Sequence, residues 1–346
     1  MLFLSPCIVQ KIHTNYFIIY SYLTGYYYLI ERNVDFFSYS NSGIYYFTKK
    51  ELNEIEDIAL NPKDVNINVF SSPIVIGLMV SNICNLKCKY CIACNANSYS
   101  KKNILLNDIN LLNDLLIASK CIGIMFSGGE PTLNTKLNEA LNKIAQERFL
   151  CELDTNGINI TDELIRIIKD KKIVPRISLD ALDKVIHDSS RGMYNVVISN
   201  IFRLIEEKIE VRINTVLYNN NKEDIFNLAR WIKEHGIKKW HIFKLRKDYA
   251  PKELWLSDNE TWKIIDSLKC QYDNDIDIIC KFKRSNDSFS SFIIDGEGNC
   301  FSTKGKEKVI FGNIFQKSIE EIWCYSPVEF RIAHLNKFLF FKGKEF

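Results

Sequence analysis

Three cysteines stand close together in the segment CNLKCKYC, with three and then two residues between Cys84, Cys88 and Cys91. Cysteine thiolates are ligands for zinc and for iron-sulfur clusters. A structural zinc site needs four ligands, which Cys94 could complete. Three thiolates can instead hold three irons of a 4Fe-4S cluster and leave the fourth iron open for chemistry. The spacing therefore predicts either an open iron-sulfur cluster or a closed zinc site.

Short apolar runs alternate with longer amphipathic runs from residue 74 onward, and this pattern indicates the elements that position the cysteines. The alternation predicts an α/β fold of parallel strands with right-handed helical crossovers, in an open or partly closed barrel. Ligands bind such folds at the carboxyl ends of the strands. We expect strands at 74–80, 122–127, 150–153, 173–179, 210–216 and 239–243, and helices near 107–119, 137–148, 162–169, 194–207 and 224–235.

Polar or glycine-rich loops follow the first four expected strands. The three cysteines follow the first strand, and Gly128-Gly129-Glu130-Pro131 follows the second. Thr155-Asn156-Gly157 follows the third strand, and Ser178 with Asp180 closes the fourth. Because these loops share one rim of the barrel, they predict a single site. A zinc knuckle would not predict the Gly-Gly-Glu-Pro loop one β/α unit downstream.

In this order, the motifs resemble the radical S-adenosylmethionine (SAM) superfamily, whose signature is a CxxxCxxC loop after the first strand of a partial (β/α)6 barrel. The resemblance covers about residues 72–245, and Tyr90 is the aromatic residue before the third cysteine. It implies that Cys84, Cys88 and Cys91 hold a 4Fe-4S cluster whose open iron is chelated by SAM. It further implies that an external electron donor drives cleavage of SAM to a 5'-deoxyadenosyl radical, which abstracts a hydrogen atom from the substrate.

The resemblance also implies cofactor contacts in the loops of the second to fourth strands. Gly128 and Gly129 would let the backbone approach a ligand closely, and Pro131 would set the turn. Glu130 would accept hydrogen bonds from the methionine ammonium of SAM.

Further cofactor contacts are implied on later elements. Ser178 and Asp180 would contact the carboxylate or ribose of SAM, and Arg191 would pair with the carboxylate. Asn156 and Asn214 are expected at strand ends beside them.

Residues 292–323 resemble the opening of the SPASM or twitch extension of peptide- and protein-modifying radical SAM enzymes, through Gly298, Gly312-Asn313-Ile314 and Ile322-Trp323. Thr303 stands where the usual cluster cysteine is found, and the later cysteine-rich block is absent. We therefore expect residues 246–346 to form a degenerate extension without clusters. The alternative is one auxiliary iron-sulfur cluster among Cys270, Cys280, Cys300 and Cys324.

Residues 1–71 contain aromatic runs split by Thr24-Gly25 and by Asn41-Ser42-Gly43, which predicts short strands joined by turns, then a helix near 49–60. This segment resembles the small winged-helix-like domains that recognise leader peptides in peptide maturases. Such domains bind a peptide as an added strand at a sheet edge. A plain β-rich cap is the alternative.

The composition excludes some partners. With 45 Lys+Arg against 42 Asp+Glu, the chain has no global field to attract nucleic acid or an anionic membrane. No apolar stretch reaches the roughly 18 residues of a spanning helix. The chain has 11 cysteines, an odd number that does not suit a complete set of disulfides, and its first residues do not resemble a signal peptide. We therefore expect the protein to work in a reducing cytoplasm.

We therefore expect a radical SAM enzyme that modifies a ribosomally made peptide by epimerisation, a thioether or a carbon-carbon crosslink. An epimerase would need a hydrogen-atom donor, for which Cys280 and Cys300 are candidates. The alternatives are a radical SAM enzyme acting on a folded protein or a small metabolite, an inactive SAM-binding regulator, and a zinc-stabilised binding module.

Overall fold

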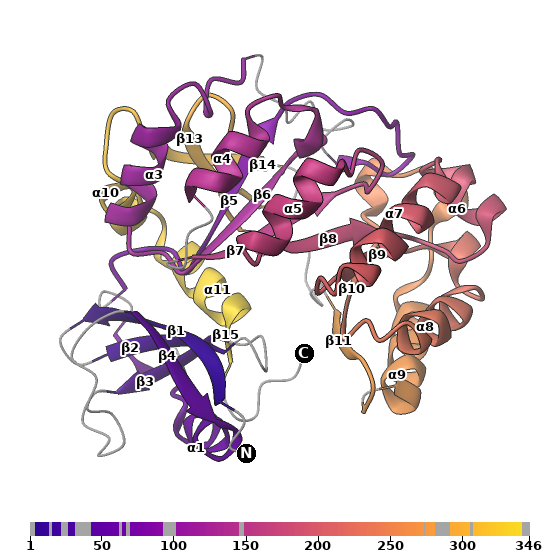
Figure 1. Cartoon of the computed structure of the whole chain (residues 1–346), viewed down its shortest axis with the longest axis horizontal. Helices are drawn as coiled ribbons and strands as arrows, with labels where there is room; N and C mark the ends of the chain where they lie inside the picture. Colours follow the sequence, from indigo (N-terminus) through magenta and orange to yellow (C-terminus); the bar gives the residue numbers. More distant parts are fainter. Residues whose placement is uncertain are drawn as a thin grey trace.

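The computed structural model describes two sheets and the helices around them (Figure 1). The description covers residues 4–13, 16–21, 27–31, 43–61, 64–66, 70–92, 102–144, 149–272, 274–280, 291–304 and 307–340. Cys94 lies outside these residues, as do the expected turns at 24–25 and 41–42.

The larger sheet has ten strands in the order β11-β10-β9-β8-β7-β6-β5-β12-β13-β14. Neighbouring strands from β5 to β11 are parallel, which confirms the predicted α/β class with a partial barrel. The first seven in chain order are β5 (Val75–Ser81), β6 (Gly123–Gly128), β7 (Leu150–Thr155), β8 (Val174–Ser178), β9 (Arg212–Leu217), β10 (Lys239–Lys244) and β11 (Asp277–Cys280).

Helices lie in the connections between these strands, within a few residues of the predicted bounds. They pack their apolar faces on the sheet, and side-chain caps begin several of them; Thr161, for example, accepts from Leu164 N at 3.2 Å. Two helices, the short α6 and the longer α9, were not expected from the sequence. The helices are α3 (Ile109–Ala118), α4 (Leu137–Ile144), α5 (Asp162–Asp170), α6 (Lys184–Ser190), α7 (Tyr194–Glu206), α8 (Ile225–Glu234) and α9 (Asp258–Tyr272), with 3-10 turns η3 (Pro131–Leu133), η4 (Asn219–Asn221), η5 (Lys247–Tyr249) and η6 (Lys252–Leu254).

The C-terminal residues extend the same sheet at both of its edges. At one edge, β11 pairs with β10. At the other, β12 (Phe292–Ile294) runs parallel to β5 and continues into the antiparallel strands β13 (Asn299–Lys304) and β14 (Glu307–Asn313). The helices α10 (Ile319–Tyr325) and α11 (Val328–Phe338) follow. The part that resembles a SPASM extension is therefore continuous with the barrel sheet.

The smaller sheet has the order β15-β3-β2-β1-β4. Its strands are β1 (Leu4–His13), β2 (Tyr16–Ser21), β3 (Tyr27–Glu31), β4 (Gly43–Thr48) and the C-terminal β15 (Leu339–Phe340), and α1 (Lys49–Ile58) packs beside it. Both faces of β2 and β3 are buried. Ile18 and Tyr20 face the main core, whereas Phe17 and Ile19 face a separate core under α1. Burial of both faces explains why the aromatic runs are continuous rather than alternating.

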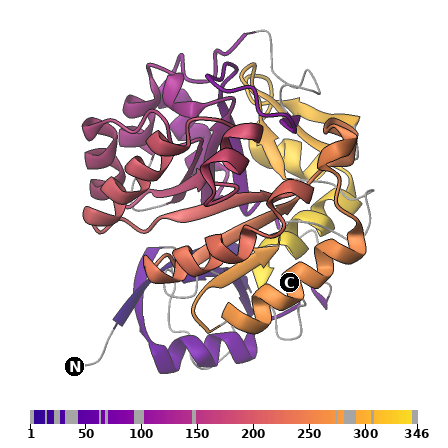
Figure 2. The same cartoon turned by 90° about the vertical axis from the view of Figure 1, so that its right-hand side faces the viewer.

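The N-terminal sheet lies at the amino ends of the barrel strands, and both Figure 1 and Figure 2 show it below the larger sheet. Arg212, the first residue of β9, donates to the Tyr20 hydroxyl at 3.4 Å. Ile74, just before β5, donates its N–H to His334 Nε2 of α11 at 3.1 Å. The cysteine loop follows the carboxyl end of β5, so the two features occupy opposite ends of the barrel.

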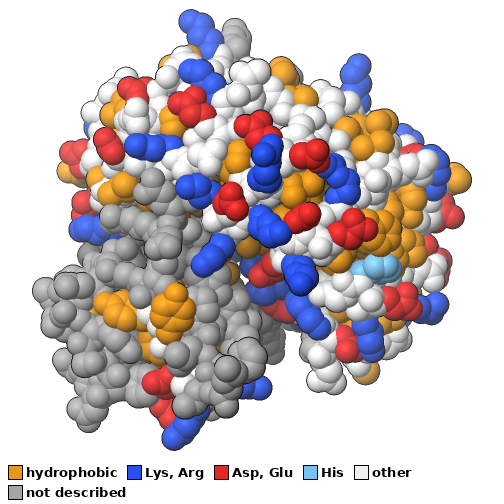
Figure 3. Space-filling model, viewed as in Figure 1, with side chains coloured by type: hydrophobic (Ala, Val, Ile, Leu, Met, Phe, Trp, Pro, Cys, Tyr) orange, Lys and Arg blue, Asp and Glu red, His pale blue; other side chains and the backbone are white. Residues whose placement is uncertain are grey.

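On the face shown in Figure 3, basic and acidic side chains are interspersed, in line with their similar totals in the sequence. Within the described residues, no helix combines the length and apolar character that crossing a membrane requires.

Candidate functional site

The cysteine loop leaves β5 through a local turn. Ser81 Oγ donates to Ile83 O at 3.0 Å and accepts from Ile83 N at 3.3 Å. The thiols of Cys84, Cys88 and Cys91 are free and half-buried, and Leu86 N donates to Cys84 Sγ at 3.4 Å. All three thiols thus belong to one short loop at the carboxyl end of the first barrel strand.

Burial makes two of these thiols reluctant to ionise on their own. Desolvation raises the pKa of Cys84, and it raises the pKa of Cys88 to about 11. Cys91 adds to the increase in both cases, and Cys84 adds to it for Cys88, because a second negative sulfur nearby disfavours ionisation. A cationic iron-sulfur core would remove this penalty, since it binds the thiolate form.

The donor set fits a 4Fe-4S cluster better than a single metal ion. Among the described residues, no three His, Cys, Asp or Glu side chains are already grouped to hold one metal ion. A 4Fe-4S cluster does not require its three cysteines to surround a single ion, because each of them binds a different iron. Three half-buried, mutually interacting thiols on one loop match that requirement.

Gly128 and Gly129 are required by a close approach to the cysteine loop. Gly129 N donates to Ser81 O at 2.8 Å, and Glu130 N donates to Ile83 O at 2.8 Å. A Cβ at Gly129 would lie 2.1 Å from Ile83 O, and one at Gly128 would lie 2.3 Å from Ser81 O. The neighbour that excludes side chains here is therefore backbone of the first loop. The expected approach of these glycines to a ligand stays a prediction.

Glu130 is buried, and its carboxylate joins the second loop to the third. Oε1 accepts from the hydroxyls of Thr132 at 2.7 Å and Thr155 at 2.6 Å, while Oε2 accepts from Asn156 N at 2.7 Å. Pro131 begins the 3-10 turn η3 directly after it. The structure thus gives Glu130 a bracing role, and its expected contact with the SAM ammonium stays a prediction.

Asn156 extends this connection back to the cysteine loop. Its Nδ2 donates to Asn85 Oδ1 at 2.7 Å, and its side chain also interacts with the Cys84 thiol and lowers the pKa of that group. Asn156 therefore lies at the rim, beside the predicted cluster ligand Cys84.

Ser178 and Asn214 pair across neighbouring strands β8 and β9, but they differ in their partners. Ser178 is half-buried, and no side-chain hydrogen bond is seen for it within the described part of the chain. Asn214 is buried, and it contacts Asp154 Oδ1 at 3.1 Å and His241 Nδ1 at 3.2 Å. Ser178 is therefore the better placed of the two for a ligand.

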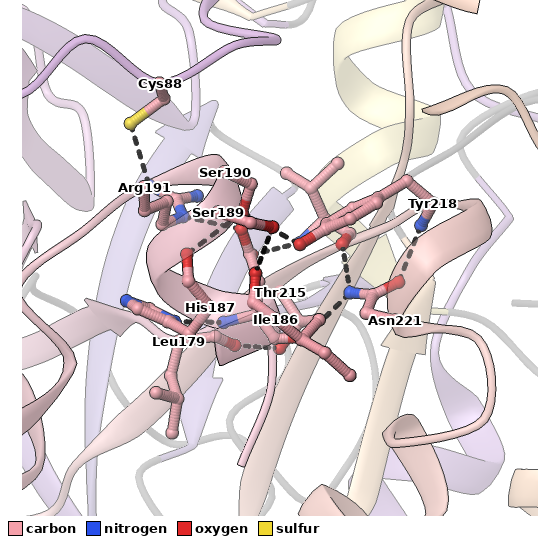
Figure 4. A network of polar contacts seen from close by, with 12 residues as sticks. Cys88, Leu179, Ile186, His187, Ser189, Ser190, Arg191, Thr215, Tyr218 and Asn221 are labelled. Carbon is pink, nitrogen blue, oxygen red and sulfur yellow. Dashed lines mark hydrogen bonds and ion pairs between the residues drawn. The ribbon is translucent and has the colours of Figure 1, made fainter. Parts of the chain in front are cut away.

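Asp180 and Arg191 form a buried ion pair, and Figure 4 shows Arg191 reaching Cys88 of the cysteine loop. Arg191 Nε lies 2.7 Å from Asp180 Oδ2, and Arg191 Nη1 lies 3.9 Å from Cys88 Sγ. Burial alone would lower the pKa of Arg191, but the charge and hydrogen bond of Asp180, together with Cys88 and Tyr218, outweigh it and raise that pKa. Asp180 Oδ1 also accepts from Val216 N at 2.9 Å. The guanidinium is thus a permanently charged group held against a predicted cluster ligand.

Tyr90 packs on this ion pair from the cysteine loop. The Arg191 guanidinium lies 5.4 Å from the Tyr90 ring centre, and the Tyr218 ring lies 5.6 Å from it. The Tyr90 hydroxyl is buried and has no hydrogen-bond partner among the described residues. An orphaned donor at this rim is a position where a bound cofactor could supply a partner.

The C-terminal cysteines come from separate elements. Cys270 on α9 and Cys324 on α10 are exposed, Cys300 on β13 is fully buried, and Cys280 is half-buried at the end of β11. Among the described residues they do not form a group of metal ligands. The auxiliary-cluster alternative thus gains no support from the arrangement. Of the two candidate hydrogen donors, only Cys280 ends a strand of the barrel.

Sequence reasoning missed a charged layer inside the barrel. Arg176 lies 2.7 Å from Glu152 Oε2 and 3.0 Å from Asp154 Oδ1, and Arg212 also pairs with Glu152. Burial, with Arg212 nearby, lowers the pKa of Lys239 to about 8. The signal available in the sequence was charge at alternate positions of predicted strands, as in CELDT, which places both acids on one face.

The chain matches known proteins through this same region. The family model of the radical SAM superfamily matches residues 78–232. The antilisterial bacteriocin subtilosin biosynthesis protein AlbA of Bacillus subtilis is 24% identical over 49% of this chain and 39% of its own length. A cysteine-type anaerobic sulfatase-maturating enzyme of Clostridium novyi is 28% identical over 46% of this chain and 47% of its own length. The chain spans about half or less of these relatives.

The fold is also shared with solved structures. Streptococcus suis SuiB has a TM-score of 0.66 at 15% identity, covering 93% of this chain and 88% of SuiB. SuiB bound to S-adenosylmethionine has a TM-score of 0.64 at 16% identity, with the same coverage.

The fold, the cysteine loop and the family match agree that residues 78–232 form a radical SAM domain. Members of this superfamily bind a 4Fe-4S cluster and SAM. In this chain Cys84, Cys88 and Cys91 are the residues suited to hold the cluster.

Proposed function

We propose that this enzyme reductively cleaves SAM and uses the resulting 5'-deoxyadenosyl radical to take a hydrogen atom from a ribosomally synthesised peptide. The observation that carries the radical chemistry is the arrangement of the rim. The loop of Cys84, Cys88 and Cys91 packs against the backbone of Gly129, and Arg191 reaches Cys88 from α6. These are the motifs expected from the sequence, brought to one end of the barrel.

The bound cluster would supply the electron that breaks the sulfur-carbon bond of SAM. The protein residues hold and orient the reactants. The three cysteines would hold the irons, and Glu130 keeps the second and third loops in register through Thr155 and the Asn156 N–H. The Ser178 hydroxyl and the buried Tyr90 hydroxyl are polar groups at the rim to which SAM could bind.

The proposed peptide substrate is supported by the kind of relatives found. AlbA is a bacteriocin biosynthesis protein, and one SuiB structure is bound to its precursor peptide SuiA. The shared fold with SuiB extends over 93% of this chain, so it includes most of the sequence outside the barrel. Other relatives, such as the GTP 3',8-cyclase of Clostridium perfringens at 29% identity, act on a small molecule.

The edges of the N-terminal sheet limit how a leader peptide could bind. One edge of β3 is occupied by β15, and Leu60 N donates to Leu29 O at 2.8 Å. The opposite edge strand is β4, which pairs with β1. We therefore propose β4 as the edge for an added peptide strand. Because this sheet lies at the amino ends of the barrel strands, a peptide bound there would have to extend past the barrel to reach the rim.

The first experiment measures iron, sulfide and zinc in anaerobically reconstituted protein, and 5'-deoxyadenosine after addition of SAM and dithionite. We expect about four irons per chain and SAM cleavage. Replacing Cys84, Cys88 or Cys91 with serine should abolish both, whereas Cys270→Ser, on the exposed face of α9, should change neither. Zinc without iron, and no deoxyadenosine, would support the zinc-stabilised module instead.

The second experiment tests the substrate. The protein is mixed with each small peptide encoded beside its gene and, separately, with GTP, and the products are analysed by mass spectrometry. A modified peptide, with no change in GTP, is the expected result. SAM cleavage that no neighbouring peptide stimulates or consumes would argue for a small metabolite or a folded protein.

If the product is an epimerised peptide, we propose Cys280 as the hydrogen-atom donor. Cys280 ends β11 and is half-buried, whereas Cys300 is fully buried and desolvation strongly raises its pKa. Cys280→Ala should stop epimerisation while deoxyadenosine still forms, and Cys300→Ala should not. Undiminished epimerisation in the Cys280 variant would overturn the assignment.

A further inference from the structure

The guanidinium of Arg191 is paired with Asp180 on one side, and its Nη1 is directed at the predicted cluster ligand Cys88 on the other. Arg191 Nε is engaged by Asp180 Oδ2 at 2.7 Å, and Arg191 Nη1 donates toward Cys88 Sγ across 3.9 Å. The guanidinium therefore lies between the carboxylate and the sulfur. Its side chain is only 13% exposed, so water screens its charge weakly.

Several contacts hold this guanidinium in place. Arg191 is the C-cap of α6, and its N–H donates to His187 O at 2.9 Å. The side chain of the preceding residue, Ser190, hydrogen-bonds the Tyr218 hydroxyl at 2.8 Å (Figure 4). The Ser190 carbonyl accepts from Lys89 N at 3.1 Å. The last contact joins the end of α6 directly to the cysteine loop. The position of Arg191 relative to Cys88 is thus set by backbone as well as by side chains.

Arg191 presents the positive end of the ion pair to Cys88. Its Nη1 lies 3.9 Å from Cys88 Sγ, whereas its Nε engages Asp180 Oδ2 at 2.7 Å. The guanidinium is therefore the member of the pair that contacts the sulfur. Hydrogen bonds to cluster sulfurs and nearby charge are among the factors that set the potential of an iron-sulfur cluster.

We propose that Arg191 is a positioning and tuning residue for the cluster, raising its reduction potential through the charge and hydrogen bond that it directs at Cys88. Reduction adds one electron, taken from an external low-potential donor, and breaks no bond. A fixed cation stabilises the more negative, reduced state, so the potential is higher with Arg191 than without it. The inference rests on the proposed cluster but concerns the electron-transfer step rather than the substrate.

The experiment is a potentiometric titration of the reconstituted cluster, monitored by electron paramagnetic resonance in the absence of SAM. Leaving SAM out removes any contribution from pairing between Arg191 and the SAM carboxylate. We expect Arg191→Met to lower the ratio of reduced to oxidised cluster at least tenfold at a set potential, which corresponds to about 59 mV for one electron. The reduction potential of Arg191→Lys should lie between those of the wild type and Arg191→Met, because lysine keeps the positive charge but lacks the planar guanidinium.

The matched control is Arg203→Gln. Arg203 lies on α7 and, like Arg191, pairs with a carboxylate, that of Asp162 on α5. This substitution should leave the potential unchanged. If the methionine variant does not load iron, Arg191→Gln and Arg191→Lys carry the test, and the lysine variant should have the higher potential. Equal potentials in that pair, or a wild-type potential in a fully loaded Arg191→Met protein, would overturn the inference. Failure of the wild-type protein to form a cluster would instead reject the proposed function.

Discussion

At the scale of single residues, Glu130 shows how one carboxylate joins the loops of the site. Its two oxygens accept from Thr132, Thr155 and the Asn156 N–H, and the residue is 1% exposed. A buried carboxylate with several donors is stable only while those donors remain, because an unsatisfied buried polar group costs free energy. This residue therefore contributes to folding even before any cofactor binds.

We predict that Glu130→Gln destabilises the protein by about 1–3 kcal/mol, the usual cost of an unsatisfied buried polar group. The glutamine can accept from the threonine hydroxyls, but its NH₂ group would then face the Asn156 N–H. Urea unfolding of the cluster-free protein measures the change. Glu163→Gln, on the exposed first turn of α5, is the control and should shift the free energy of unfolding by less than about 0.5 kcal/mol. Equal effects of the two variants would contradict the bracing role of Glu130.

At the scale of elements, the turn between β12 and β13 is organised by one buried aspartate. Asp295 Oδ1 accepts from Glu297 N at 2.9 Å and from Asn299 N at 3.0 Å, and Asp295 Oδ2 lies 2.9 Å from Lys308 Nζ of β14. Gly298 completes the turn at φ +82°, where a Cβ would lie 2.5 Å from Phe315. These contacts explain why the Asp-Gly-Glu-Gly-Asn segment forms the turn of a hairpin.

The same aspartate gives a pH prediction. Burial alone would raise the pKa of Asp295, but hydrogen bonds from Lys308 and Asn299 outweigh it and lower that pKa below its ordinary value of 3.8. A lowered pKa in the folded state contributes stability above the unfolded-state pKa, and this contribution is lost as the pH falls through the folded value. The difference in free energy of unfolding between wild type and Asp295→Asn should therefore be constant near pH 6–7 and shrink below about pH 4. Urea unfolding at a series of pH values measures it.

Asp266→Asn on the exposed face of α9 is the control for this series, and its difference from wild type should stay small and nearly independent of pH. If the Asp295→Asn difference grew as the pH fell, the ionised carboxylate would not be the stabilising form.

At the scale of the whole molecule, the N-terminal sheet and the barrel share one hydrophobic core. Ile18, Tyr20 and Leu29 of the small sheet belong to the same buried cluster as Leu339 of β15 and the barrel strands. Burial of the Tyr20 hydroxyl, which is hydrogen-bonded to Arg212, raises the pKa of Tyr20 to about 12. Trp323 of α10 adds a further link through a hydrogen bond to Phe70 O at 2.6 Å. The sheet is therefore an integral part of the fold.

We predict that a chain beginning at residue 71 does not fold stably, because its barrel would expose the apolar surface that Ile18, Tyr20 and Leu29 cover. The full chain should unfold in one transition, with tryptophan fluorescence and far-UV circular dichroism giving the same midpoint. A truncated protein that unfolds with the wild-type midpoint would show that the N-terminal sheet is an independent domain after all.

The sequence by itself determined the class of the protein and the order of its site. Spacing marked Cys84, Cys88 and Cys91 as candidate ligands of a cluster or a metal ion. Hydrophobic periodicity located the strands β5 to β10 and the helices α3, α4, α5, α7 and α8, because both signals are local to a few residues. The rule that parallel strands end on one rim then brought Cys84, Glu130 and Asp180 into one site. Resemblance to a known family supplied the cofactors.

The tertiary structure alone decided which groups touch within that site. It directed Arg191 to Cys88, 103 residues away in the chain, and placed Gly129 on the backbone of Ile83. It also separated Cys280 at the end of a barrel strand from Cys300 in the core. Such contacts depend on how distant elements pack, and local propensity carries no information about packing across more than a hundred residues. That is why the sequence could name these residues but not their partners.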